Sequence, residues 1–193
     1  TVNWRFDWIV EPGGGMPDPV VADDLVCMSW AYDPPLNLAG FLLQLTEAGT
    51  RLVWKTPDLV TIGPAPVILD GYIYTLHFGL TQGTAMPIAS LQCIDLDTGE
   101  VVWEELGERR EGKMLTLTAA NETLIILDDQ GTLTTAEASP EGFKEIARCE
   151  VLAGASLSRR FWTPPVLCNA KIYCRNFAGD LVCLDVSKPE VTP

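Results

Sequence analysis

A pair of short apolar segments joined by a polar turn returns at a regular interval along the chain. The clearest copies, PVVADDLVC, PVILDGYIY and PVLCNAKIYC, begin at Pro19, Pro66 and Pro165. Pro66 follows Pro19 by about one period of roughly 48 residues, and Pro165 follows Pro66 by about two. The segment LTLTAANETLIIL, which begins at Leu115, fills the place between the last two. The chain therefore contains one structural unit in four copies.

The second half of the unit repeats as well. GTRLVWKT brings Trp54 near the end of its unit, TGEVVWEE brings Trp103 near the end of the next, and the opening VNWRFDW places Trp4 about one period earlier. ASLQCIDL is matched by GDLVCLDV near the end of the chain. Each unit thus holds four short strands, and the chain begins on the last strand of one unit and ends on the third strand of another.

Units of four short strands with this period are typical of β-propeller blades, because one sheet cannot bury both its faces and must stack on others. We predict an all-β chain, a β-propeller of four-stranded antiparallel blades with four blades in a single segment over residues 1–193. The blades are expected at about 19–57, 65–106, 115–152 and 163–187, and residues 1–9 form the outer strand of a blade completed by closure. The sequence GFKEIARCEVL, residues 142–152, fits a helix or an edge strand, and the strand is favoured.

Charge and hydropathy exclude two classes of partner. The formal net charge is −13 and the pI about 4.3, so the chain repels nucleic acid and anionic lipid surfaces. No apolar stretch approaches the roughly 20 residues that a membrane helix needs, so no membrane insertion is expected.

The segment SLQCIDLDTGEVVWEE resembles the repeat of pyrroloquinoline-quinone-like (PQQ-like) propellers. An apolar strand with a small or thiol residue leads there through an Asp-x-x-Thr-Gly turn to a strand ending in Trp, and GDLVCLDV is similar to the start of the same repeat. The resemblance is weakest in the third unit, where GTLTTAEASPEGFKEIARCEV has no Trp. It implies that Trp4, Trp54 and Trp103 pack between neighbouring blades.

Enzymes of this family are quinoprotein dehydrogenases, which close about eight blades around a quinone and a calcium ion and often carry a disulfide between adjacent cysteines. This chain has no Cys-Cys pair, and no catalytic position is matched. We therefore expect the non-catalytic branch, with no catalytic, cofactor-binding or metal-binding residue: a binding or scaffold module of an exported bacterial protein, in the periplasm or outside the cell. The alternatives are a fragment of a quinoprotein dehydrogenase whose catalytic groups lie outside this chain, and a glycan- or peptide-binding propeller.

The acidic turn DLDTG, residues 95–99, is interpreted as a hairpin hinge. In Asp97-Thr98-Gly99 the aspartate side chain can accept a hydrogen bond, and the glycine can adopt the positive φ that a tight turn needs. A calcium loop would need more regularly spaced oxygen ligands than Asp95, Asp97 and Glu100 provide.

The six cysteines and the one histidine are also interpreted as structural. Cys27 and Cys174 are assigned to the same place in the repeat, and Cys93 and Cys183 share another, so the thiols replace apolar core residues. One pair among the cysteines of the last unit could still form a disulfide if the protein is exported. His77, at a strand end, is assigned no catalytic role.

Cation and aromatic residues gather before the last unit in SRRFWTPP. We predict a candidate binding surface at the axial end of the propeller, because these residue types are enriched at binding hot spots. Its members are Arg159, Arg160, Phe161, Trp162 and Tyr32.

Ring closure can follow three routes: four blades closing alone, two chains joining head to tail, or this chain serving as half of a longer one. We expect a ring of about eight blades, so the partners are another protein or a second copy in a homodimer of half-rings.

Overall fold

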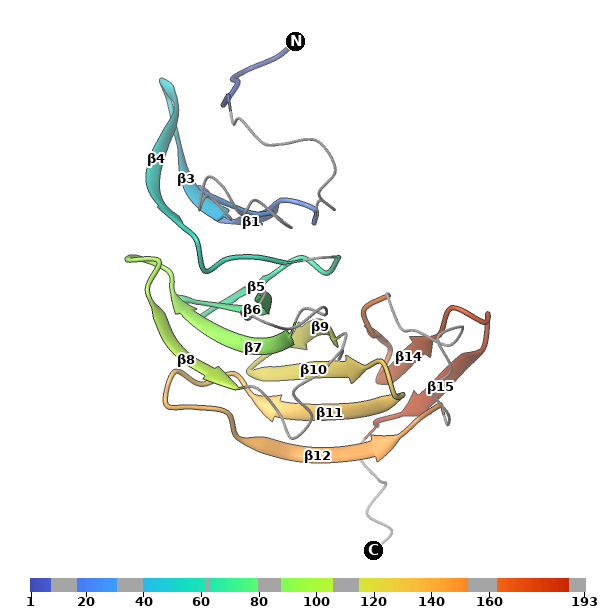
Figure 1. Ribbon diagram of the computed structural model, residues 1–193. Helices are drawn as coiled ribbons and strands as arrows, with labels where there is room; N and C mark the ends of the chain where they lie inside the picture. The colour runs from blue at the N-terminus through green and yellow to red at the C-terminus, as the bar shows by residue number, and fades with distance from the viewer. Residues whose placement is uncertain are drawn as a thin grey trace, which may run out of the picture. The chain divides into compact units, whose positions relative to one another are not determined.

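The computed structural model describes residues 1–7, 17–30, 40–61, 63–79, 88–105, 115–152 and 163–187. In these ranges the regular structure consists of β-strands, which pair antiparallel in four sheets (Figure 1). The predicted all-β propeller fold class is therefore confirmed. No helix in the described part of the chain has the length and apolar character needed to cross a membrane.

The chain forms two compact units, Thr1–Lys113 with Ala138–Phe143, and Met114–Glu137 with Lys144–Pro193. The first unit contains two four-stranded sheets. The first sheet has the order β1 (Val20–Ala22), β2 (Leu25–Ser29), β3 (Gly40–Thr46), β4 (Gly49–Thr56). The second sheet has the order β5 (Val67–Leu69), β6 (Tyr72–Gly79), β7 (Ile88–Asp95), β8 (Val101–Glu105).

The second unit contains one complete and one shorter sheet. The third sheet has the order β9 (Leu115–Ala120), β10 (Thr123–Asp128), β11 (Thr132–Glu137), β12 (Glu145–Glu150). The fourth sheet has three strands, β13 (Val166–Cys168), β14 (Lys171–Arg175) and β15 (Leu181–Asp185), drawn in red in Figure 1. The strand favoured within residues 142–152 is confirmed as β12. The limits of the repeat units and their assignment to one propeller segment stay predictions.

The first hairpin of each sheet has a two-residue turn. Asp70 and Gly71 have φ values of 47° and 80°, and Asn169 and Ala170 have 50° and 54°. In the first and third sheets only the first turn residue has positive φ, at 52° for Asp23 and 51° for Asn121. Positive φ matches the right-handed twist of the flanking strands, and Asp, Asn and Gly adopt it most readily.

The outer strand of every four-stranded sheet contains a one-residue bulge. Leu42 pairs with Trp54, but Leu43 pairs with Leu52, so Val53 is an extra residue. The equivalent extra residues are Val102 in β8 and Ile146 in β12. Because a bulge turns the strand, it changes the face on which the following side chains lie.

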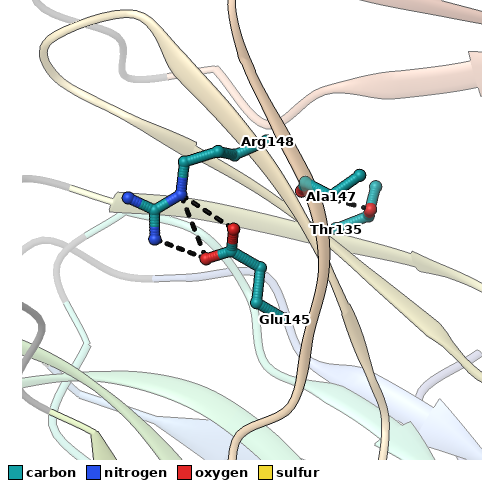
Figure 2. A network of polar contacts seen from close by, with 4 residues as sticks. All are labelled: Thr135, Glu145, Ala147 and Arg148. Atoms are coloured by element: carbon teal, nitrogen blue, oxygen red, sulfur yellow. Dashed lines mark hydrogen bonds and ion pairs between the residues drawn. The ribbon is translucent and has the colours of Figure 1, made fainter.

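Figure 2 shows the effect of the bulge in the third sheet. Glu145 and Arg148 are three residues apart, which would place them on opposite faces of a regular strand, yet Arg148 Nε donates to the Glu145 carboxylate at 2.9 and 3.1 Å. Thr135 Oγ1 on β11 donates to Ala147 O at 3.4 Å. The hydrogen bond from Arg148 lowers the pKa of Glu145.

Apolar side chains fill the space between neighbouring sheets within each unit. In the first unit Cys27 and Leu42 of the first sheet pack with Ile73 and Ile94 of the second. In the second unit Ile125 and Leu127 of the third sheet pack with Ile172 and Cys174 of the fourth. A further cluster, Val26, Phe41 and Leu43, covers the other face of the first sheet, and Phe6 packs against it.

Candidate functional site

The candidate binding surface predicted from the sequence lies outside the described residues. This applies to all five of its members, Tyr32, Arg159, Arg160, Phe161 and Trp162. The surface therefore stays a prediction.

Trp54 lies between the first two sheets. Its Nε1 donates to Leu96 O at 2.8 Å, and its ring packs against the cluster that contains Ile73 and Ile94. The indole also lies over Gly99, where an added Cβ would come within 2.8 Å of it. The bulge at Val53 precedes this tryptophan and directs it to the neighbouring sheet.

Trp103 and Trp4 have different surroundings. Trp103 Nε1 donates to Ser139 O at 2.9 Å, and its ring lies 6.3 Å from that of Tyr74, tilted by 50°. Trp4 is 43% exposed. Two residues further on, the ring centroid of Phe6 lies 5.1 Å from that of Phe41. A packing role for the three tryptophans stays a prediction, which substitution can test.

The DLDTG turn is organised by Asp95. One carboxylate oxygen, Oδ1, accepts hydrogen bonds from Asp97 N at 3.1 Å, Thr98 N at 2.8 Å and Thr98 Oγ1 at 2.9 Å. These bonds, chiefly those from Thr98, lower the pKa of Asp95 because they favour the charged form. The acidic residue therefore folds the turn that receives Trp54.

His77, Ser90 and Glu104 lie on neighbouring strands, but their hydrogen bonds differ from those of a nucleophilic triad. Ser90 Oγ donates to Glu104 Oε1, and the Ser90 residue is 1% exposed. His77 Nδ1 lies 2.7 Å from Asp58 O, so Nδ1 must be the donor. The serine proton is thus directed to a carboxylate, and the imidazole is held by the backbone.

The six cysteines divide equally into buried and exposed thiols, and none forms a disulfide. Burial raises the pKa of Cys27 to about 12 and those of Cys93 and Cys174 to about 11. The exposed thiols are Cys149, Cys168 and Cys183. The last two lie on the same face of the fourth sheet, since Cys183 pairs with Tyr173 and Cys168 pairs with Lys171.

The fourth sheet has an unpaired edge and an open face. β15 has β14 on one side and no strand of the described residues on the other. Ile172 and Cys174 point to the third sheet, whereas the opposite face carries Val166 (54% exposed) and Leu181 (66% exposed). An open sheet edge with apolar residues beside it is a surface for pairing with another strand.

Sequence reasoning did not find this open face, nor a buried polar pair on the second sheet, Thr75 and Gln92. The missing fourth strand was visible in the repeat count. The polar pair was visible only as a departure from the mostly apolar residues at the matching positions of the other units.

Comparison with protein-family models returns no match, and neither does comparison with curated proteins. Among solved structures, the chain is similar to BamB from Moraxella catarrhalis, with 14% identity and a TM-score of 0.55 over 90% of this chain and 46% of that one. It is also similar to the computationally designed protein Ika8, with 12% identity and a TM-score of 0.51 over 92% of this chain and 51% of that one. The chain thus spans about half the length of the structures it matches. At these identities the likeness shows the fold alone, that of a β-propeller.

Proposed function

We propose that the chain is a non-enzymatic binding or scaffold module, whose protein partner covers the open face of the fourth sheet. The observation that carries this proposal is the exposure of positions that the other three sheets bury. At the third position of the second strand, Cys27, Tyr74 and Ile125 are at most 3% exposed, while Tyr173 is partly exposed.

The fifth position of the same strand gives the same result. Ser29, Leu76 and Leu127 are at most 2% exposed, whereas the fourth sheet has the exposed Arg175. Arg175 pairs with Leu181 and Tyr173 with Cys183, so these four residues share one face. Lys171 and Asp185, whose Nζ and Oδ2 are 3.7 Å apart, lie at its margin. An apolar centre with charged margins is typical of a protein interface.

The partner that fits this face is a further sheet of the same kind, from a second copy of the chain. The first and third sheets present the matching face to the next sheet of their own unit, which buries it. Residues 1–9 of the second copy would supply the missing strand beside β15, because Val2-Asn3-Trp4 follows the pattern of Leu52-Val53-Trp54. Two half-rings joined in this way form a closed dimer.

Light scattering at several protein concentrations tests this proposal. We expect a mass near twice the 21.1 kDa of one chain. Leu181→Asp should weaken association at least tenfold, because it places a charge on the apolar part of the face. The matched control is Ile146→Asp, at an exposed apolar residue of β12, and should leave the mass unchanged. A single-chain mass at all concentrations would contradict the dimer and favour a closed four-bladed ring or a longer chain.

We also propose that the protein is exported, to the periplasm or outside the cell. The support is the resemblance of its repeat to PQQ-like propellers. A fusion to alkaline phosphatase, which becomes active only after export, should be active in a bacterial host that makes the full-length protein. An inactive but intact fusion would count against export.

A further inference from the structure

The face of the second sheet that looks toward the first changes from apolar to polar along its strands. Ile73 pairs with Ile94 in the apolar cluster, and Thr75 pairs with Gln92 as the next pair on the same face. Thr75 is fully buried and Gln92 is 3% exposed. Two buried polar side chains therefore lie opposite each other, directly beside the apolar cluster.

Neither side chain satisfies its hydrogen-bonding capacity within the described part of the chain. Thr75 Oγ1 and Gln92 Oε1 are both buried and have no hydrogen-bond partner there, so they also make no direct bond to each other. Buried polar groups are almost always paired, and an unpaired one destabilises the folded state. Two such atoms on one cross-strand pair need an explanation.

An apolar pair would fit this position, as the first and fourth sheets demonstrate. Met28 and Phe41 hold the matching places in the first sheet, and Cys174 and Val182 hold them in the fourth. In the third sheet Ile126 pairs with Thr134, so the second sheet differs from the others in having two polar residues at this place.

The polar pair continues to the surface. Gln92 pairs with Glu104 on β8, which is exposed. Thr75, Gln92 and Glu104 thus form a polar row across three neighbouring strands, from the interior to solvent. The facing part of the first sheet is polar too, since Ser29 Oγ and Thr61 Oγ1 lie 3.0 Å apart.

We propose that an ordered water molecule bridges Thr75 Oγ1 and Gln92 Oε1. Water can donate to the amide oxygen and either accept from or donate to the hydroxyl, so it satisfies both atoms at once. A cation is a poorer occupant, because the buried pair offers two neutral oxygens and no carboxylate. This water site is separate from the open face of the fourth sheet and does not depend on the proposed function.

A high-resolution crystal structure of the unmodified chain tests the site directly. We expect one peak of density within hydrogen-bonding distance of both oxygens. A dry pair, or density too large for one water, would overturn the proposal.

Urea unfolding of variants provides a second test, which does not need crystals. Thr75→Val and Gln92→Leu should each lower the urea midpoint, since each leaves the water and the other side chain without a partner. In the double variant the urea midpoint should fall by clearly less than the sum of the two single decreases, because both partners of the water are removed together. Thr116→Val is the matched control, because this buried threonine donates directly to Leu127 O. When it is combined with Gln92→Leu, the two decreases in the urea midpoint should simply add. Single variants more stable than the unmodified chain would show that the pair is dry and overturn the water site.

Discussion

Trp54 connects the first two sheets through one hydrogen bond and one flat ring surface. Its indole N–H donates to the carbonyl oxygen of Leu96, in the turn that follows β7. The turn itself is fixed by the three hydrogen bonds that Asp95 accepts. Trp54 and Asp95 thus take part in the contact between the outer strand of the first sheet and the turn that follows β7.

Replacing Trp54 with phenylalanine should destabilise the chain by about 1–2 kcal/mol, because the ring contact is largely kept while the Leu96 carbonyl loses its donor. Urea unfolding at pH 7 measures this loss. Phe177→Leu, at a residue that is 74% exposed, should change stability by less than about 0.5 kcal/mol. Equal losses for the two variants would argue against a packing role for Trp54.

Asp95→Ala should destabilise the chain by about 1 kcal/mol at pH 7, and the difference from the unmodified chain should shrink at acid pH. The pKa of Asp95 is lower in the folded chain than its ordinary value of 3.8. The charged form therefore stabilises the fold above about pH 4, and this contribution is lost as the pH falls through the lowered pKa. Unfolding curves at pH 7 and pH 3 test this expectation, with Asp97→Ala, an exposed neighbour, as control. A loss that stays constant with pH would contradict it.

At the scale of elements, the strands and their turns follow from local patterns. Alternating apolar residues and Asp, Asn and Gly at the turns predicted the hairpins, because these turns require positive φ. The bulges could not be predicted, since one extra residue in a short strand leaves the apolar pattern almost unchanged.

A separate one-residue error concerns the cysteines. Cys27 and Cys174 were assigned to one place in the repeat, but the hairpin registers put Cys27 at the third position of its strand and Cys174 at the fourth. Their side chains therefore lie on opposite faces of their sheets. Both are buried nonetheless, because each of these faces packs against a neighbouring sheet.

The contact between turn and outer strand can be tested at Gly99. An alanine Cβ there would lie 2.8 Å from Trp54 Cδ2, and the φ of 74° is unfavourable for alanine, so Gly99→Ala should lose about 2–3 kcal/mol in urea unfolding. Gly179→Ala is the matched control, with a φ of 94° and no atom within 4 Å, and should lose about 1 kcal/mol. Similar losses of stability for Gly99→Ala and Gly179→Ala would mean that the turn does not pack against the Trp54 indole.

At the scale of the whole molecule, the repeat predicts a propeller, but closure depends on surfaces that a repeat count does not describe. The pattern showed that the last unit lacks a strand. The mixed face around Tyr173 and Arg175 became visible only when burial at matching positions was compared. The predicted cluster at Arg159 to Trp162 falls in a part of the chain that the structure does not describe.

Thiol labelling of the intact chain tests how the fourth sheet is covered. Cys27, Cys93 and Cys174 should stay unlabelled at pH 8 until the chain unfolds, because they are buried and their raised pKa values keep them protonated. Cys149 should react quickly at every protein concentration. Cys168 and Cys183 should react quickly in dilute protein and slowly in concentrated protein, if a second copy covers their face. Concentration-independent labelling of these two thiols would contradict such a cover.

The bulges of the outer strands also limit which peptides can mimic a native strand. An uninterrupted peptide that paired with a third strand would fall out of step by one residue beyond the bulge, and its later side chains would then point to the wrong face. A peptide that lacks the extra residue would thus either leave part of the strand unpaired or, if it carries a tryptophan at the place of Trp54, turn that indole toward solvent. If the strand that completes the fourth sheet also contains a bulge, the backbone alone disfavours pairing with unrelated strands, independently of their side chains.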